Sequence, residues 1–216
     1  MQTKKRKRRS GLPQERGVKR REGLKTAALT LLGQAGFQDI TYQRIADNAG
    51  VPLASCYHFY RNKLDLVRVL ADELTEEYVE IVFDSDKYRN AVSWQDCIDI
   101  YVRASVAHHN RSTAELRIFF SGDVPLTLRQ DALQREKSMG LRLFGVLSER
   151  FDVPDLPDPE NLFFRAVEIA RTVLALDYQE VGSLTDDSAT EAVRAVTGYL
   201  SNYLPPVLAS KSTLFK

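Results

Sequence analysis

The sequence contains little sulfur and no long apolar segment. Its 216 residues include only two cysteines, Cys56 and Cys97, whose separation fits neither a metal-binding motif nor a disulfide framework. No stretch is apolar over the ~18 or more residues that a membrane-spanning helix needs. The basic N-terminus is not followed by an apolar segment, so it does not read as a secretory signal. We therefore expect a cytoplasmic protein with no membrane association.

Motifs that carry catalytic chemistry are also missing. There is no glycine-rich phosphate loop, no zinc-binding helix motif and no nucleophile elbow. The His108–His109 pair lacks carboxylate or cysteine ligands at a regular spacing, so the sequence predicts no metal site. We expect no cofactor and no enzymatic activity; an all-helical enzyme remains the weakest of three alternatives.

Charge is distributed unevenly along the chain. Residues 1–70 hold 15 Lys and Arg against 5 Asp and Glu, whereas the rest holds 15 against 24. Six of the basic residues form the run KKRKRR at positions 4–9. A basic head on an acidic body is typical of a protein that binds a polyanion such as nucleic acid.

Apolar residues recur with helical spacing along most of the chain. Leu24, Ala27, Ala28, Leu31 and Ala35 form one such face. Further helices are expected over 42–49, 52–60, 62–84, 93–110, 113–121, 123–150, 158–181 and 187–204. No alternating run suggests a strand, so we predict an all-α protein with about nine helices. Residues 152–159, DVPDLPDP, mark a clear break.

Residues 42–60 predict a helix-turn-helix motif. Ala46 is small where a second helix would cross the first, and Gly50 can adopt the positive φ of a tight turn. Cys56 would point inward as an apolar filler, and Tyr60 would pack in the core. Leu53, Ala54, Ser55, Tyr57 and His58 would face outward, and the small side chains among them would let a helix backbone approach the major groove of DNA.

Residues 21–68 resemble the DNA-binding domain of the tetracycline-repressor (TetR/AcrR) family of bacterial transcription regulators. The resemblance is carried by LLGQAGF, ITYQRIADNAGV, Tyr57, Tyr60, Lys63 and NKLDLV. It implies a homodimeric, all-helical regulator that binds a palindromic operator on double-stranded DNA and responds to a small-molecule effector. The family's DNA contacts would fall on Gln43, Leu53, Ala54, Ser55, Tyr57, His58, Phe59 and Lys63. Tyr57 and Lys63 would contact backbone phosphate, and Gln43, Ser55 and His58 are the candidates for base edges.

The sequence departs from the family pattern in two places. Phe59 cannot donate the hydrogen bond to phosphate that a His or Tyr usually supplies there, and Pro52 and Leu53 replace polar residues. Leu53 can contact a thymine methyl group instead. The operator sequence, the regulated genes, the effector and the choice between repression and activation stay open.

The resemblance also implies that the last two long helices form the dimer interface, over residues 159–204. Their apolar positions could equally pack inside one chain. The helix expected over 159–181 carries Leu162, Ala166, Ala170, Val173 and Leu176 or Asp177, and the helix expected over 187–204 carries Ala192, Ala195, Val196, Tyr199, Leu200 and Tyr203.

A polar and aromatic face in the middle of the chain predicts a ligand pocket. Tyr101, Ser105 and His108 lie on one side of the expected helix over 93–110. The predicted lining is Tyr101, Ser105, His108, Phe120, Phe144 and Arg171, although for each of these residues ordinary packing is the alternative.

These observations divide the chain into three parts. Residues 1–14 form a flexible basic arm that we expect to touch phosphates, although it could be inert. Residues 15–68 form the helix-turn-helix DNA-binding domain, and residues 69–210 the ligand-binding and dimerisation domain. The expected function is a homodimeric repressor released from its operator by a small molecule. An architectural DNA-binding protein without effector control is the alternative.

Overall fold

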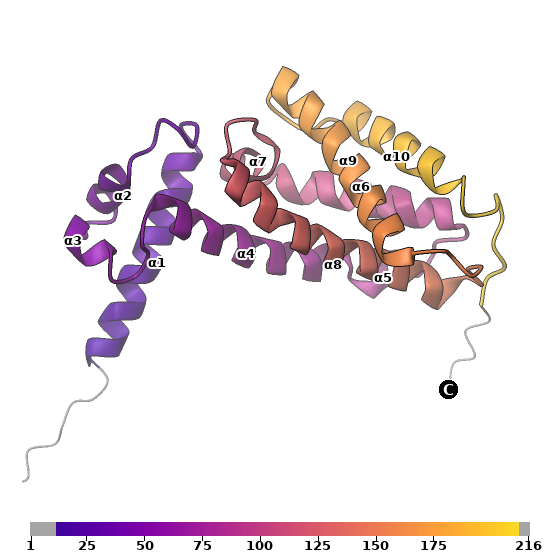
Figure 1. Cartoon of the computed structure of the whole chain (residues 1–216), viewed down its shortest axis with the longest axis horizontal. Coiled ribbons are helices and arrows are strands. Elements are labelled where there is room, and N and C mark those ends of the chain that lie inside the picture. Colours follow the sequence, from indigo (N-terminus) through magenta and orange to yellow (C-terminus); the bar gives the residue numbers. More distant parts are fainter. Residues whose placement is uncertain (1–11, 212–216) are drawn as a thin grey trace, which may run out of the picture.

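The computed structural model describes residues 12–211, and helices make up most of that range (Figure 1). Within it no strand occurs, and one isolated antiparallel bridge joins Phe151 to Ser210. The helices are α1 (Leu12–Leu32), α2 (Tyr42–Asn48), α3 (Leu53–Cys56), α4 (Lys63–Val82), α5 (Ser85–Tyr88), α6 (Trp94–His109), α7 (Thr113–Phe120), α8 (Leu126–Arg150), α9 (Pro159–Val181) and α10 (Asp186–Leu200). The all-α prediction is confirmed, and the short α5 is the helix that the periodicity did not reveal.

The first helix starts earlier than the sequence indicated. α1 begins at Leu12, so residues 12–14, which we assigned to a flexible arm, are helical. The rest of the predicted arm, residues 1–11, lies outside the described residues.

The N-terminal unit, which we call the head, consists of α1 to α3 and the first turns of α4. Thr41 caps α2 by accepting a hydrogen bond from the Arg44 amide. Gly50 then takes φ of 64°, the left-handed conformation that the turn into α3 requires. Leu24, Ala28, Ile45, Ala46 and Cys56 are buried in the core beneath these helices.

The second helix of the motif is shorter than predicted. α3 ends at Cys56 instead of reaching Tyr60. The hydroxyl of Tyr42 donates hydrogen bonds to the carbonyl oxygens of Cys56 and Tyr60, at 3.1 and 2.9 Å. The amides of His58 and Phe59 instead bond three residues back, which tightens the chain into turns. Tyr60 is thereby drawn into the core, where it is buried as predicted.

The C-terminal unit, which we call the body, contains α5 to α10 and the second half of α4. Its core is built around large side chains such as Trp94, Phe151, Phe163, Leu143 and Leu147, all less than 2% exposed. α8 and α9 lie in close contact. A Cβ atom added at Gly140 would be only 2.6 Å from the backbone nitrogen of Phe164. α9 ends at Gly182, whose φ is 80°.

Three elements join the head to the body, and one of them is α8, whose Leu128 lies in the head's core. α4 starts beside α1 in the head and runs into the body (Figure 1). α7 also contacts the head: Ala114 and Ile118 lie in the head's core, and Arg117 donates a 2.6 Å hydrogen bond to the Leu32 carbonyl oxygen. The head's core therefore extends past residue 68 to side chains far along the chain. None of the helices among the described residues is long and apolar enough to cross a membrane.

Candidate nucleic-acid interface and internal cavity

The head presents the predicted contact residues around α3. Ala54, Tyr57 and His58 are exposed, whereas Leu53, Ser55 and Phe59 are half-buried. Val51 and Cys56 are buried and anchor the motif from below. The exposed side chains on this surface are therefore a small one, Ala54, and two aromatic ones, Tyr57 and His58.

Tyr57 is held in a defined direction although 54% of it is exposed. Its ring packs edge-on against Tyr42, with the ring centroids 5.4 Å apart and the planes at 80°. Tyr42 is fixed in turn by its hydrogen bonds to the Cys56 and Tyr60 carbonyls. The Tyr57 hydroxyl is thus presented on a supported ring.

Gln43 lies on the exposed side of α2, near the same surface. Its side-chain amide donates a 2.6 Å hydrogen bond to Asp47, one turn further along the helix. This bond orients the amide group, which the sequence indicated as a candidate for a base edge.

Lys63 has a different environment from the one predicted. Its ammonium group donates 2.6 Å hydrogen bonds to the carbonyl oxygens of Phe37 and Ile40 and lies 4.0 Å from the centroid of the Phe37 ring. Burial lowers the pKa of this group, while Asp123 and Asp39 act in the opposite direction. The side chain thus ties the start of α4 to the loop after α1 and is not directed outward to a phosphate.

Basic residues outside the motif also lie on the head's surface. Arg16, Lys19, Arg20 and Arg21 are exposed along α1, and Arg61 is exposed between α3 and α4. Lys25 differs, because it pairs with Glu22 at 2.9 Å and Glu73 at 2.7 Å. The free cations of the described head are therefore available for long-range attraction of a polyanion.

An internal cavity of about 60 Å³ lies in the body. Five helices supply its walls, with Tyr78 from α4, Tyr101 and Ser105 from α6, Phe120 from α7, Met139 from α8 and Leu174 from α9. A second hollow of about 330 Å³ lies toward the head, and the two share Phe119, Phe120, Glu136 and Arg171. These four side chains separate a mainly apolar chamber from a larger one.

Hydrogen bonds fix the polar groups on the α4–α6 side of the cavity. The hydroxyls of Tyr78 and Ser105 are 2.7 Å apart, and Ser105 donates a 2.7 Å bond to the Tyr101 carbonyl oxygen. Burial raises the pKa of both Tyr78 and Tyr101, so these phenols remain protonated.

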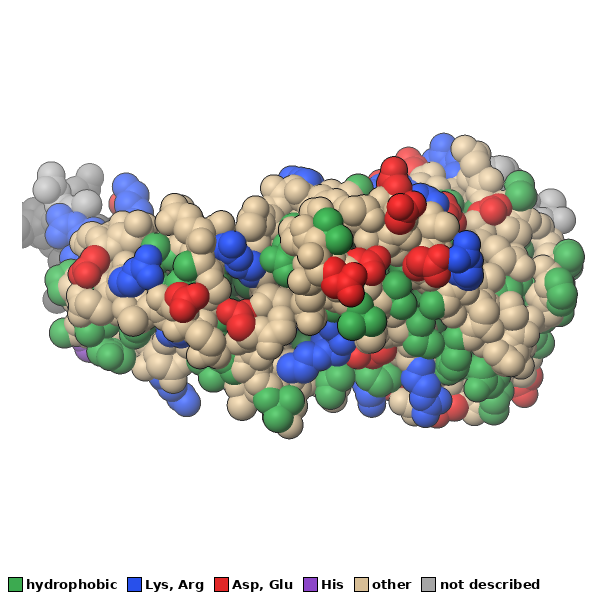
Figure 2. Space-filling view, turned by 90° about the horizontal axis from the view of Figure 1, so that it is seen from above, with side chains coloured by type: hydrophobic (Ala, Val, Ile, Leu, Met, Phe, Trp, Pro, Cys, Tyr) green, Lys and Arg blue, Asp and Glu red, His purple; other side chains and the backbone are tan. Residues whose placement is uncertain are grey.

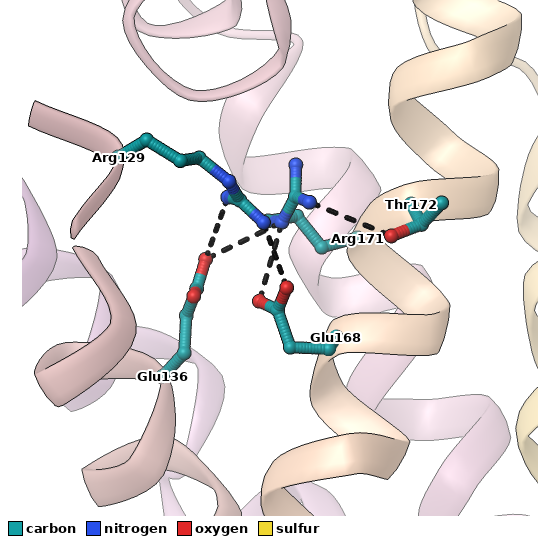
Figure 3. A network of polar contacts seen from close by, with 5 residues as sticks. All are labelled: Arg129, Glu136, Glu168, Arg171 and Thr172. Atoms are coloured by element: carbon teal, nitrogen blue, oxygen red, sulfur yellow. Dashed lines mark hydrogen bonds and ion pairs between the residues drawn. The ribbon is translucent and has the colours of Figure 1, made fainter. Parts of the chain in front are cut away.

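A charged network forms the opposite wall (Figure 3). Arg129 lies 3.2 Å from Glu136 and 2.7 Å from Glu168, and the Arg171 side-chain nitrogen lies 3.4 and 3.3 Å from the same two carboxylates. Both arginines approach the Oε1 atom of Glu136, while its Oε2 atom is buried without a hydrogen-bond partner.

The two carboxyl groups of this network titrate in opposite directions. Burial and the neighbouring Glu168 carboxylate together raise the pKa of Glu136. Burial acts against ionisation of Glu168 too, but the neighbouring Glu136 and the Arg171 and Arg129 charges lower the pKa of Glu168 overall. One proton is therefore favoured on Glu136, beside an ionised Glu168.

The structure places four of the six predicted pocket residues at the cavity: Tyr101, Ser105, Phe120 and Arg171. The other two predicted residues do not line this cavity. His108 is buried, and its neighbour His109 lines the cavity instead. Phe144 is half-buried and packs against Phe163 at the edge of the core, with the ring centroids 5.2 Å apart.

Sequence reasoning missed Glu136, Tyr78 and Met139, whereas Phe119, which it named as a further candidate, does line the cavity. A signal for Glu136 was present: it continues the four-residue spacing of Leu128, Ala132 and Gly140 along α8. A charged residue at an otherwise small or apolar position of a helix face indicates a polar group directed into the interior.

The outer face of α9 and α10 carries apolar side chains. Of the residues predicted for an interface, Leu162, Ala166, Ala170, Ala192, Val196 and Leu200 are buried within the chain's own core. Val173 and Tyr199 are half-buried, whereas Leu176 and Tyr203 are exposed at 59% and 39%. Figure 2 views the molecule from the side on which α9 and α10 lie in Figure 1, and apolar side chains gather among charged ones over the body.

These features together define a DNA-binding protein of the helix-turn-helix class with a helical body that encloses a cavity. Residues 24–70 match the family of bacterial regulatory proteins described as the tetR family. No curated protein sequence matches the chain.

Solved structures share the fold over most of the chain. A TetR-family transcriptional regulator from Streptomyces coelicolor is 24% identical, with a TM-score of 0.66, and the match covers 86% of this chain and 99% of that one. A TetR transcription regulator from Haloarcula marismortui is 19% identical, with a TM-score of 0.61 and coverage of 87% and 99%. The dihydroxyacetone kinase operon activator DhaS is 12% identical, with a TM-score of 0.54 and coverage of 87% and 99%.

The sequence match over the head and the fold of the whole chain agree with each other. The head thus carries a tetR-family sequence match, and the chain as a whole shares the fold of solved TetR-family regulators.

Proposed function

We propose that the protein is a homodimeric repressor that binds a palindromic operator and is released from it by a small-molecule effector. The observation that carries the proposal is the course of α4. Its first residue, Lys63, is tied to the head's loop carbonyls, and Thr75 and Tyr78 on the same helix line the cavity. One rigid element therefore touches both the proposed DNA-binding unit and the proposed effector site.

The proposed DNA-contacting surface is Gln43 with residues 53–55 and 57–59. Ala54 allows close approach of α3 to the major groove, while Tyr57 is supported for a phosphate contact. The Lys63 side chain is turned to the loop carbonyls, so at this position the proposed phosphate contact is made by the N-terminus of α4, whose backbone amides favour an anion.

The proposed effector is an aromatic or aliphatic compound with one hydrogen-bonding polar group. Apolar and aromatic side chains dominate the cavity, and the Oε2 atom of Glu136 is a buried polar atom without a partner, which carries the proton when Glu136 is protonated. The smaller chamber alone is below the ~300–1,000 Å³ of typical ligand sites. Binding would therefore displace Phe119 or Phe120 and join the two chambers.

Such a displacement offers a route to the head. Phe119 and Phe120 belong to α7, whose Ala114 and Ile118 pack in the head's core. An effector releases DNA only if it binds the DNA-incompetent arrangement more tightly, so movement of α7 and α4 must accompany binding.

The proposed dimer forms through α9 and α10, within residues 159–204. Val173, Leu176 and Tyr199 supply apolar surface on the outer face, and Tyr203 lies just past the end of α10. A two-fold symmetric dimer presents two α3 surfaces to half-sites spaced by about one helical turn, ~34–36 Å.

The first experiment is capture of random genomic fragments by the purified protein at ~150 mM salt, followed by sequencing. We expect a shared palindrome, which a Tyr57→Ala variant tested in parallel should fail to recover. Recovery of fragments without a common sequence would favour an architectural DNA-binding protein instead.

A transcription assay from the recovered site then decides the direction of regulation. Repression is expected when the site overlaps a promoter. Increased transcription would instead align the protein with the structural neighbour named as an operon activator.

A further inference from the structure

Three potential metal ligands meet where α6 ends and α7 begins. The Nε2 atom of His108 lies 3.2 Å from Oε2 of Glu115, and the Nδ1 atom of His109 lies 3.7 Å from the same oxygen. Each of the three residues offers one ligand atom, and these atoms all lie within 4.8 Å of one another. The histidines are adjacent in sequence, but Glu115 arrives from the next helix, so the sequence spacing did not reveal the group.

The cluster is buried and only partly satisfied. His108 and His109 are 4% and 8% exposed. The Nδ1 atom of His109 and the Oε2 atom of Glu115 have no hydrogen-bond partner, although both are buried. Buried polar atoms of this kind are ordinarily paired, so these atoms require an explanation.

Packing and capping hold the three side chains in place. The His109 ring stacks on Tyr78 at a centroid distance of 5.0 Å, and the His108 ring meets Tyr78 edge-on at 5.4 Å. Ser112 accepts a hydrogen bond from the Glu115 amide and thereby fixes the first turn of α7. The fold thus holds the three side chains near one another, and all three ligand atoms lie within 4.8 Å of each other.

We propose that His108, His109 and Glu115 form a binding site for one divalent transition-metal ion of the zinc type. Zinc binds imidazole nitrogen at ~2.0–2.1 Å and carboxylate oxygen at ~2.0–2.2 Å in tetrahedral geometry, which separates ligand atoms by roughly 3.3–3.5 Å. The two separations from Glu115, 3.2 and 3.7 Å, bracket that range.

A tetrahedral ion bound by these three residues would take one further ligand. Two nitrogen ligands and one oxygen ligand leave a tetrahedral ion one position short, and water or a donor atom of another molecule fills it. His109 also lines the internal cavity. The open position therefore lies near the space proposed for an effector.

A bound ion would fasten α6 to α7 close to the head. Arg117, two residues after Glu115, bonds the Leu32 carbonyl oxygen, and Ala114 and Ile118 lie in the head's core. The ion site does not depend on the proposed repressor function; only an effect of the ion on DNA affinity rests on that function.

Titration of the chelator-treated full chain with Zn²⁺ and with Co²⁺ tests the site. We expect one ion per chain by calorimetry, and visible Co²⁺ absorption typical of nitrogen and oxygen ligands without a thiolate band. Glu115→Gln, which keeps the side-chain size, should weaken binding by at least ~10–100-fold, the loss typical of even an indirect supporting residue.

His58→Ala is the matched control, because His58 is the third histidine of the chain and is exposed on the head. It should bind Zn²⁺ as the wild type does. Absence of stoichiometric binding, unchanged affinity in Glu115→Gln, or loss of binding in His58→Ala would each overturn the proposal.

Unfolding measurements guard against a trivial loss of structure. Zn²⁺ should raise the Tm of the wild type and of His58→Ala, but not that of Glu115→Gln. If Glu115→Gln is unfolded without metal, His109→Gln takes its place under the same criteria. DNA affinity measured with and without Zn²⁺ is a separate result: no change would reject the coupling to the head and leave the ion site standing.

Discussion

The head and the body place their functional residues in different ways. In the head, the proposed contacts other than Gln43 and Lys63 lie within residues 53–59, on α3 and the turn after it. In the body, the cavity takes its walls from five helices between Thr75 and Leu174. A surface that enters a groove is built from neighbours along the chain, whereas an enclosed space requires elements that meet only in the folded molecule.

The two regions also treat charge differently. The head leaves cations such as Arg16, Arg20 and Arg61 exposed. The body instead directs Glu136 and Arg171 into the wall of its cavity, where they pair. Exposed charge acts at long range on a polyanion, while buried charge must be paired locally and gives directional recognition.

The largest expected effect is on the packing of the body. Gly140→Ala adds a Cβ that would lie 2.6 to 2.9 Å from backbone atoms of Phe163 and Phe164, so α8 and α9 must separate. Overpacking of this kind costs about 1–3 kcal/mol of unfolding free energy. The change should lower the Tm by about 2–4 °C for each kcal/mol, as thermal unfolding would show.

Gly145→Ala in the same helix is the control, since nothing lies within 4 Å of its added Cβ. It should be neutral or stabilise the helix by up to about 1 kcal/mol. Equal Tm values for the two variants would contradict the close approach of α8 and α9.

The next effect is on DNA binding by the head. Tyr57→Ala removes the supported, exposed hydroxyl, and loss of a hydrogen bond to a charged group costs about 1.5–3 kcal/mol, or roughly 10–100-fold in affinity. Fluorescence anisotropy with the recovered operator measures this change, and the dimer should be retained by size-exclusion chromatography.

Tyr60→Phe is the corresponding core change. Its hydroxyl is buried without a partner, so the substitution should leave both DNA affinity and stability nearly unchanged or slightly improve stability. Full operator affinity in Tyr57→Ala would remove Tyr57 from the contact surface.

Substitution of Lys63 distinguishes a structural role of this side chain from a contact with DNA. Lys63→Met removes the donor to the Phe37 and Ile40 carbonyls and should cost about 1–3 kcal/mol of stability. Arg61→Met also removes one positive charge, from an exposed position, and should leave the Tm unchanged. An unaltered Tm in Lys63→Met with weakened operator binding would instead favour the phosphate contact.

The N-terminal basic run gives a smaller, sequence-independent effect. Deletion of residues 1–10 removes six cations and should reduce the salt dependence of DNA affinity, by a slope of about 0.9 for each phosphate that the run neutralises. Binding measured between ~50 and ~200 mM salt gives the slope. An identical slope would show that the run stays off the phosphates.

A last effect is the pH dependence from Glu136. Burial and Glu168 raise its pKa above the ordinary 4.5, so the folded chain binds this proton more tightly than the unfolded chain. The resulting stability is fully present below pH ~4.5 and is lost as pH rises through the folded pKa.

Glu136→Gln imitates the protonated form and has no such titration. Its Tm should match the wild type near pH 5 and exceed it increasingly toward pH 9, as differential scanning fluorimetry at each pH would show. A constant difference across this range would mean that Glu136 keeps an ordinary pKa.

Sequence patterns were most informative about the head. The spacing of Ala46, Gly50 and Tyr57 predicted the helix-turn-helix motif. In the structure Tyr57 is exposed and Tyr60 is buried, as the sequence indicated. The end of α3 was predicted wrongly, because a hydroxyl from α2 binds the carbonyls of Cys56 and Tyr60 and stops the helix.

The body was less predictable. Its helix boundaries followed from caps and breaks, as at Ser93 and Gly182. The sequence could not predict that His109, and not His108, lines the cavity. A rotation of α6 by a few tens of degrees about its axis decides which of two adjacent residues faces a given direction. Glu115 reaches these histidines only because α7 folds back beside α6.

The sequence by itself determined that the chain is helical, where most helices begin and end, and which residues form the helix-turn-helix. These properties depend on side chains within one or two helical turns of each other, so local spacing suffices. Only the tertiary structure decided the cavity, the Glu136 network, the fixed role of Lys63 and the His108–His109–Glu115 group. Each of these joins residues from different helices, whose relative position is set by packing of the whole core and not by any local pattern.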